Sequence, residues 1–248
     1  MKNKFTYRSG QTEQMDVPGI PRELLQQNLR ELDLLNHALG GHSATLEGIK
    51  KLITDKGRSY QIADLGSGSG DSLKQIALWA RKNKIKVILT GVDNKADAID
   101  YLCFRCSRFP EIQGLVSDYK DYLNKTQSPD IILCSLFCHH LSDIELVWLF
   151  QKLAEKARVG FIVNDLERNK LAWYGAKILT TVLKGTSLSK NDGPISVLRG
   201  FKREELHHLL KQAGIQRYEL HQRWAFRYLI IARSSVTQSN HHANTDGK

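Results

Sequence analysis

The chain lacks the long apolar runs and the cysteine framework that would place it in a membrane or in an oxidising compartment. Its apolar runs are far shorter than the roughly 18 residues that a bilayer-spanning helix needs. The first residues carry charge but no apolar segment follows, so we expect neither a secretory signal nor membrane insertion. Four cysteines, at positions 103, 106, 134 and 138, give no disulfide framework. These absences predict a cytoplasmic protein with reduced thiols.

The chain also lacks blocks of like charge, although it is strongly basic. Lys and Arg number 36 against 26 Asp and Glu, for a formal net charge of +10, but no run of five or six basic residues occurs. A basic balance can indicate nucleic acid or another acidic partner. Many cytosolic enzymes are basic as well, and the charge here is scattered, so we do not expect a nucleic-acid partner. The sequence leaves the role of the charge open.

The N-terminal part of the chain predicts an irregular arm and two helices. Residues 1–20 show no periodicity. Pro21 stands where a helix can begin, because its missing N–H is not needed in the first turn, and leucines follow it at helical spacing. Gly40 and Gly41 end that helix, and Ser43 is placed to cap the next one.

From residue 60 onward, strand and helix patterns alternate, and with 41% hydrophobic residues the chain can bury one large core. We expect strands at 60–65, 85–92, 112–116, 129–135 and 158–163, with helices at 71–83, 95–108, 142–156, 168–184 and about 202–213. A loop is expected at 185–196, and two closing strands at 215–222 and 224–232 can only form an antiparallel hairpin. Such alternation is typical of a mostly parallel sheet covered by helices on both faces. The expected divisions are an arm and helical cap (1–56), a ligand-binding domain (57–233) with a lid insertion at about 167–200, and a disordered tail (234–248).

The most informative motif is Tyr-Gln-Ile-Ala-Asp-Leu-Gly-Ser-Gly-Ser-Gly-Asp at 60–71. An apolar strand breaks into three alternate glycines, Gly66, Gly68 and Gly70, and a helix opens at Asp71, which we expect to be its N-cap. Glycine permits a sharp turn and a close approach of the backbone to a ligand. The helix N-terminus behind the turn favours an anionic group. This arrangement predicts a nucleotide-like ligand, of which nicotinamide cofactors and S-adenosylmethionine (SAM) are both candidates.

Polar residues follow the next strands at the same edge of the predicted sheet, where open α/β folds bind ligands. Asp93 ends the second strand, at a position where a carboxylate can accept both hydroxyls of a ribose or cap the next helix. Asp118 follows the third strand, as a ligand contact or a surface residue. The segment 135–143 follows the fourth and carries the adjacent His139 and His140, which could remove a proton from a phenol, enol or acidic carbon, or could only pack.

The order of these elements resembles a class I SAM-dependent methyltransferase over about residues 20–233, since that family's seven-stranded sheet ends in such a hairpin. The segment 135–143 is similar to small-molecule enzymes of the ubiquinone- and menaquinone-biosynthesis type and to polyketide-tailoring relatives. The resemblance implies a Rossmann-like α/β fold and SAM as the cofactor. It implies His140, with His139 beside it, as the candidate catalytic residue. The residues that it implies for cofactor binding are Asp64, Gly66, Ser67, Gly68, Gly70, Asp93, Asn94, Asp118, Tyr119 and Ser135.

We therefore expect methyl transfer to an oxygen or an activated carbon of a small acceptor, which the resemblance suggests is aromatic or polyketide-like. The alternatives are an RNA or protein methyltransferase, a nicotinamide dehydrogenase, and a SAM-binding partner subunit without activity. The sequence Leu-Phe-Cys-His-His after the fourth strand departs from the Asn/Asp-Pro-Pro-Tyr/Phe of amino-methylating nucleic-acid enzymes. Glycine spacing and the hairpin count against a dehydrogenase. We expect no metal, buried free thiols at the four cysteines, and Trp173 and Tyr174 either in a lid-helix core or in an acceptor pocket.

Overall fold

The computed structural model describes residues 3–125 and 128–234, so that most of the tail expected at 234–248 lies outside the described residues. One seven-stranded sheet organises this part of the chain, in the order β3-β2-β1-β4-β5-β7-β6. Strand β7 runs antiparallel to both of its neighbours, and the other strands are parallel to one another. The strands are β1 (Ser59–Leu65), β2 (Lys86–Asp93), β3 (Ile112–Val116), β4 (Ile131–Ser135), β5 (Gly160–Leu166), β6 (Tyr218–Arg223) and β7 (Arg227–Arg233). The predicted mostly parallel sheet with a closing hairpin is confirmed.

Helices cover both faces of the sheet, because neighbouring residues of the central strands point to opposite sides. On β5, Ile162 packs with α2, α3 and α4, whereas Phe161 and Val163 pack with α5, α6 and α9. Both faces are therefore apolar, as a doubly covered parallel sheet requires. The helices are α1 (Arg22–Ala38), α2 (Gly41–Leu52), α3 (Asp71–Lys82), α4 (Ala96–Arg105), α5 (Tyr119–Lys125), α6 (Asp143–Lys156), α7 (Lys170–Val182), α8 (Ser187–Arg199) and α9 (Arg203–Gln212), with short 3-10 helices η1 (Gln14–Asp16) and η2 (Cys138–His140).

The prediction of a loop at 185–196 is wrong, because helix α8 occupies most of that segment. Its Ser, Lys, Asn, Gly and Pro residues are typical of a loop, but tertiary contacts support a helix. The Thr186 hydroxyl accepts the Ser189 N–H and so caps the helix. Glu31 of α1 accepts the Thr186 N–H, and Leu188 and Val197 are buried. Helix α5 occupies another segment where the sequence pattern indicated no helix.

Two helix starts also differ from the prediction. Helix α2 already begins at Gly41, so Ser43 lies inside it, and Asp71 is the first residue of α3 rather than its cap. The cap positions belong to Gly40 and Gly70, whose φ angles are 74° and 72°. This left-handed conformation suits glycine. The chain can therefore turn directly from each preceding segment into the helix.

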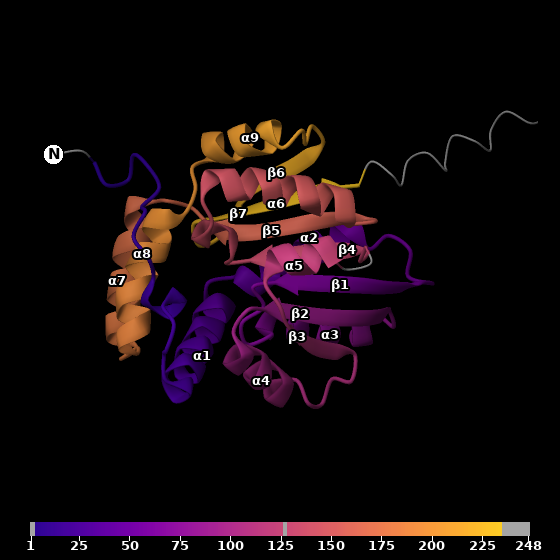
Figure 1. Ribbon diagram of the computed structural model, residues 1–248, viewed down its shortest axis with the longest axis horizontal. Helices are drawn as coiled ribbons and strands as arrows, with labels where there is room; N and C mark the ends of the chain where they lie inside the picture. Colours follow the sequence, from indigo (N-terminus) through magenta and orange to yellow (C-terminus); the bar gives the residue numbers. More distant parts are fainter. Residues whose placement is uncertain (1–2, 126–127, 235–248) are drawn as a thin grey trace, which may run out of the picture.

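Helices α1, α7 and α8 lie together at one end of the molecule, beyond the end of the sheet (Figure 1). The N-terminal arm runs beside α8, where Ser9 N–H donates to the Leu198 carbonyl and Asp192 accepts the Gln14 N–H. These elements form a cap over the carboxyl ends of the parallel strands. Within residues 3–125 and 128–234, none of the helices is both long and apolar enough to cross a bilayer.

Candidate active site

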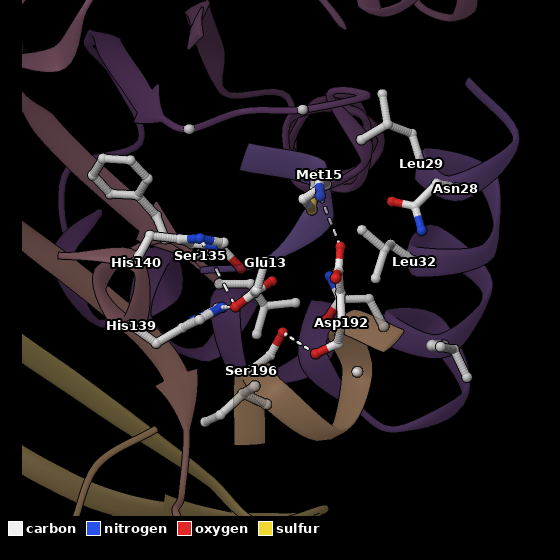
Figure 2. A pocket seen from close by; sticks show the side chains of 18 of the residues that line it. Glu13, Met15, Asn28, Leu29, Leu32, Ser135, His139, His140, Asp192 and Ser196 are labelled. Carbon is white, nitrogen blue, oxygen red and sulfur yellow. Dashed lines mark hydrogen bonds and ion pairs between the residues drawn. The ribbon is translucent and has the colours of Figure 1, made fainter. Parts of the chain in front are cut away.

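A cavity of about 940 Å³ lies between this cap and the carboxyl ends of the strands (Figure 2). Its walls come from α1, α7, α8, the arm, the glycine turn and the ends of β1, β2 and β4. Its volume lies near the upper end of the range for small-molecule pockets. All but one of the sequence-predicted cofactor residues line it, the exception being Gly70. Both candidate histidines line it as well.

The glycine turn is held against β2 and has no room for side chains at its first position. Gly66 N–H and Ser67 N–H both donate to the Val92 carbonyl, over 2.8 and 3.1 Å. Gly66 has a φ of 70°, and a Cβ there would lie 2.4 Å from the Phe137 ring. Only glycine fits both the conformation and the space. The turn therefore presents backbone rather than side chains to the cavity.

Asp64 is a buried carboxyl group at the end of β1, in the cavity wall. Its Oδ1 has no hydrogen-bond partner among the described residues. Burial raises the pKa of Asp64 well above its ordinary value, and the charges of Asp71 and Asp93 raise it further. A buried carboxyl of this kind is stabilised by a cationic ligand. Its surroundings fit the ammonium group of an amino acid.

Asp93 has two interactions within the protein itself. Its Oδ2 accepts the Gly68 N–H over 3.1 Å and its Oδ1 accepts the Lys95 N–H over 2.9 Å. It therefore fixes the glycine turn and the start of the next helical segment. Burial raises the pKa of Asp93, and the two N–H donors oppose that rise. Each carboxylate oxygen has more than one lone pair, so these bonds leave acceptor capacity toward the cavity.

Asp118 and Tyr119 form the edge of the cavity beyond β3. Asp118 is exposed, and its Oδ1 accepts the Lys120 N–H over 2.7 Å at the start of α5. Tyr119 packs edge-to-face against Phe137 and Trp148. Burial raises the pKa of Tyr119 to about 12. Both interpretations of Asp118, as a cap and as a cavity residue, are compatible with this position.

The two histidines occupy different environments although their rings are only 4.2 Å apart. His139 is buried, with Nδ1 lying 2.7 Å from Asp165 Oδ1 and Nε2 lying 3.5 Å from Glu13 Oε1. Burial alone would raise the pKa of Asp165, but the charge and hydrogen bond of His139 outweigh it and lower that pKa. Both ring nitrogens of His139 thus face carboxyl groups.

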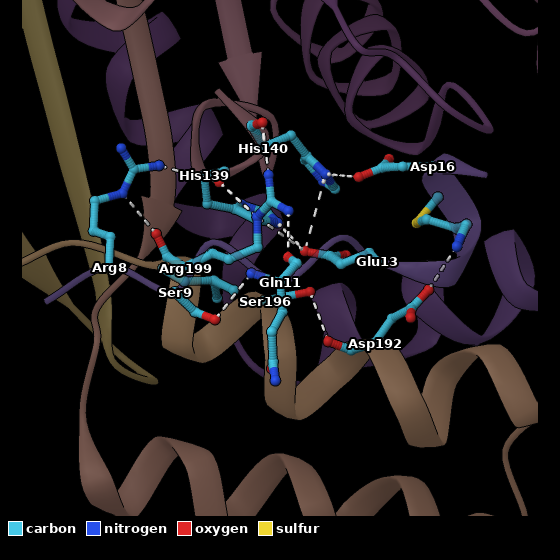
Figure 3. Close-up of polar contacts among 12 residues, drawn as sticks. Arg8, Ser9, Gln11, Glu13, Asp16, His139, His140, Asp192, Ser196 and Arg199 are labelled. Carbon is cyan, nitrogen blue, oxygen red and sulfur yellow. Dashed lines mark hydrogen bonds and ion pairs between the residues drawn. The ribbon is translucent and has the colours of Figure 1, made fainter. Parts of the chain in front are cut away.

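His140 is held through one nitrogen only. Its Nδ1 lies 2.9 Å from Asp16 Oδ2 in η1 (Figure 3). Burial tends to raise the pKa of Asp16, but the hydrogen bond and charge of His140 outweigh it and lower the pKa. A carboxylate on Nδ1 fixes the ring and its tautomer, as the aspartate of a catalytic triad does. Nε2 of His140 is then the nitrogen that can act on a ligand.

Two arginines hold the backbone of η2 in place. Arg8 Nη2 donates to the carbonyls of His139 and Leu141, and Arg199 donates to those of His139 and His140. Arg8 also donates to the Arg199 carbonyl over 2.9 Å. Figure 3 shows both guanidinium groups beside the histidine pair. The arm and α8 therefore position the histidines jointly.

Glu13 is a site residue that the sequence analysis missed. It is buried, and its Oε1 lies 3.8 Å from Arg199 Nε as well as near both histidines. Burial raises its pKa to about 7, although the charges of His140 and Arg199 and a contact with Ser196 oppose the rise. A single Glu in a segment without periodicity gives no signal in a sequence. Asp192 anchors this segment by accepting the N–H groups of residues 14 and 15.

Two clusters in the described part of the chain bring three metal-binding groups within 4.8 Å of one another. The first is Glu13 with His139 and His140, and the second is Asp33, His42 and Asp71. In the second cluster, Asp33 is already bonded to both His42 and Arg105. Neither cluster contains a cysteine, and the absence of a metal stays a prediction.

Two other expectations need correction. The four cysteines are free thiols, but Cys103 is exposed on α4 and only the other three are buried. Tyr174 is exposed and Trp173 packs against Phe5 and Lys4 of the arm, so neither lies in a lid-helix core or in the cavity wall. The residues of α7 that do line the cavity are smaller or aliphatic, among them Ala172, Gly175 and Ile178.

Comparison with solved structures identifies the fold. Human N-acetylserotonin methyltransferase, solved with SAM, matches with a TM-score of 0.60 and 16% sequence identity, over 86% of this chain and 56% of that one. The plantazolicin methyltransferase BpumL, solved with S-adenosylhomocysteine (SAH), matches with a TM-score of 0.61 and 14% identity, over 86% and 95%. This chain has the class I methyltransferase fold.

Other comparisons add to this picture. A SAM-dependent methyltransferase from Aquifex aeolicus matches with a TM-score of 0.59 and 15% identity, over 87% of this chain and 99% of that one. The chain spans only 56% and 60% of the human enzyme and of an O-methyltransferase-like protein from Nostoc punctiforme. No protein-family model and no curated protein matches the sequence.

Proposed function

We propose that this protein is a SAM-dependent methyltransferase that methylates an oxygen or an activated carbon of a small aromatic or polyketide-like metabolite. The observation that carries the proposal is that a single cavity has two walls with different chemical groups. One wall holds the glycine turn with Asp64 and Asp93, and the other holds His140 backed by Asp16. The likeness to small-molecule methyltransferases is consistent with it, as is the apolar lining from α1 and α7.

The residues of the first wall fit SAM. The unpartnered carboxyl of Asp64 is suited to the ammonium of the methionyl part, and the turn at Gly66 and Gly68 leaves room for that part to lie against the backbone. Asp93 is placed for the ribose hydroxyls, and Asp118 and Tyr119 for the adenine. Bound SAM supplies the chemistry, an electrophilic methyl group on a sulfonium.

His140 is the group that would take a proton from the acceptor. A phenol has a pKa near 10 and is largely un-ionised at pH 7. A neutral imidazole whose Nδ1 is fixed by Asp16 can accept that proton at Nε2, while Asp16 stabilises the resulting cation. His139, bonded to Asp165 and facing Glu13, is assigned a positioning role.

Calorimetry with SAH and with NAD tests the cofactor. We expect SAH to bind and NAD not to bind. Preferential binding of NAD would refute the proposal. Transfer of label from methyl-labelled SAM to a panel of phenols and polyketide-like compounds tests the acceptor class. Methylation of RNA or protein, without methylation of any small molecule, would replace the function by one of its alternatives.

The histidine assignment is tested with His140→Ala once an acceptor is found. Turnover should fall on the order of 10²- to 10⁴-fold, with SAH affinity nearly intact. His208→Ala, an exposed histidine of α9, is the control. Full turnover in His140→Ala would mean that the reaction proceeds by positioning alone.

A further inference from the structure

Arg227 is a buried charge that the proposed site leaves unexplained. It begins β7, is 3% exposed and lines the cavity. Its Nε and Nη1 have no hydrogen-bond partner within the part of the chain that the structure describes. Burial lowers its pKa to about 10, so it still carries its charge at neutral pH. The charges of Asp165 and Asp71 favour the guanidinium. Its two unpartnered N–H groups stay unsatisfied unless a further acceptor, such as an anion, joins them.

The surroundings of Arg227 are suited to an anion. Gly41 is the first residue of α2, and a Cβ added to it would lie 3.0 Å from the guanidinium carbon of Arg227. Helix α2 has no side-chain cap, so its first N–H groups and its positive dipole end lie at this corner. Asn36 lies beside Gly41 as well, because the same added Cβ would lie only 1.6 Å from Asn36 Oδ1. The missing side chain of Gly41 thus makes room for both groups.

A buried acidic group also lies in the same cavity. Asp64 is buried without a partner on Oδ1 in the described structure. Asp71 acts electrostatically on both Asp64 and Arg227, and Asn36 donates to Asp71 over 3.1 Å. Asp64 and Arg227 both line the cavity, each within electrostatic reach of Asp71, and no ion pair joins them in the described structure. A ligand with one positive and one negative end would satisfy both, as an α-amino acid does.

We propose that Arg227 binds the α-carboxylate of the cofactor's amino-acid end, opposite Asp64. This inference rests on the proposed function, since it takes SAM as the ligand. The planar guanidinium can hold a carboxylate through two parallel hydrogen bonds, and the N-terminus of α2 adds to the attraction. The last strand of the sheet, and not only the glycine turn, then contributes to cofactor affinity.

The test is calorimetry of Arg227→Met with SAH and with 5′-methylthioadenosine, which lacks the amino-acid end. SAH affinity should fall roughly 10- to 100-fold, as for a lost charge-assisted hydrogen bond, and 5′-methylthioadenosine affinity should stay within about twofold. Arg233→Met is the matched control, because Arg233 lies at the exposed end of the same strand. Unchanged SAH affinity in Arg227→Met overturns this proposal, whereas failure of the parent to bind SAH overturns the proposed function.

Stability separates a binding role from a structural one. Without ligand, Arg227→Met should melt at or above the parent temperature, because the substitution removes buried N–H groups that have no partner. Arg227→Lys keeps the charge but loses the planar pair of N–H donors, and should weaken SAH selectively as well. It also replaces Arg227→Met if that variant does not fold. Lower stability of Arg227→Met with normal SAH binding would assign Arg227 to the fold and refute the proposal.

A different observation, on helix α7, supports a second inference. Leu171, Ile178 and Val182 are 68%, 61% and 69% exposed, and Tyr174 is exposed with them. Their spacing places all four on one side of the helix. Exposed apolar side chains are ordinary one at a time, but a stripe along one helix indicates a contact surface.

The charges beside this stripe are all positive. Lys170 and Lys177 lie seven residues apart on α7, so they follow one edge of the stripe, and Lys184 follows just beyond the end of the helix. All three are exposed. From Lys170 to Asn191 the sequence contains no Asp or Glu. An apolar stripe edged by lysines is typical of helices that lie in the surface of an anionic membrane.

The geometry points to an anionic membrane surface as the partner of α7. Leu171, Ile178 and Val182 also line the cavity, so the stripe adjoins its mouth. An acceptor dissolved in the bilayer could then reach the cavity without crossing water. Such docking is peripheral and needs no membrane-spanning helix.

Sedimentation with vesicles tests this inference. The protein should bind vesicles of phosphatidylcholine with 30% phosphatidylglycerol about tenfold or more tightly than vesicles of phosphatidylcholine alone, with binding weakened by salt. Ile178→Glu should abolish binding, and Ile144→Glu, at an 85% exposed position on α6, should not. No binding by the parent, or equal loss in both variants, would overturn the inference. So would dimerisation through the stripe, seen by light scattering as a dimer that Ile178→Glu dissociates.

Discussion

The unusual pKa of Glu13 makes a quantitative prediction for stability. Replacing Glu13 by Gln keeps the shape of the side chain and removes its ionisation. In the folded protein the pKa is about 7, against an ordinary value of 4.5. Between pH 4.5 and pH 7 the folded protein keeps a proton that the unfolded chain releases. Glu13 therefore destabilises the fold increasingly as the pH rises through this window, and most above it.

The size of the effect follows from the shift. Each pKa unit corresponds to 1.36 kcal/mol, so Glu13→Gln should stabilise the protein by about 1 kcal/mol at pH 5 and about 3 kcal/mol at pH 8. Urea-induced unfolding of both proteins at the two pH values measures this. Titrating groups that do not interact with Glu13 are shared by both proteins and cancel in the comparison. Glu155→Gln, on the exposed surface of α6, should show no such pH-dependent gain.

A clear result would refute the reasoning. If Glu13→Gln were less stable than the parent at pH 8, the ionised carboxylate would be stabilised by the groups around it, and its pKa in the folded protein would not be raised. Its ion pairs with His139 and Arg199 would then outweigh its burial. An equal difference at both pH values would mean that Glu13 has an ordinary pKa.

Further variants test other parts of the structure. Asp93→Ala should lower SAH affinity about tenfold or more, because it removes charge-assisted bonds, and unchanged affinity in calorimetry would leave Asp93 only its role in the turn. Arg168→Met breaks the ion pair between buried Arg168 and partly exposed Glu205, removes the donor of the Gly200 carbonyl and should lower the free energy of unfolding by about 1–3 kcal/mol; no loss in urea unfolding would contradict this account. A thiol reagent should label native Cys103 much faster than Cys106, and Cys103→Ser should remove the fast phase. RNA binding measured by filter retention should vanish as salt approaches physiological strength. Tight RNA binding at physiological salt would favour a nucleic-acid substrate instead.

The alternation of short apolar runs with helical patterns, the glycine turn and the closing hairpin were all readable in the sequence. These features depend on local chemistry. Gly66 is required by its own φ angle and by Phe137, and the strands of the sheet centre are apolar because both of their faces are covered. Since parallel strands end at one edge, the positions of Asp64, Asp93 and His140 along the chain already indicated a common site.

Tertiary structure alone decided what surrounds these residues. Helix α8 has the composition of a loop, and forms because Thr186 caps it and α1 packs against it. Glu13 belongs to a segment without periodicity, and only the fold of the arm buries it beside the histidines. Arg227 did leave a signal, a charge opening the buried strand Arg-Tyr-Leu-Ile-Ile-Ala-Arg, but its missing partner could be recognised only in the packed cavity. Sequence patterns reflect the local backbone preference of each residue, whereas burial and charge pairing depend on neighbours far away in the chain.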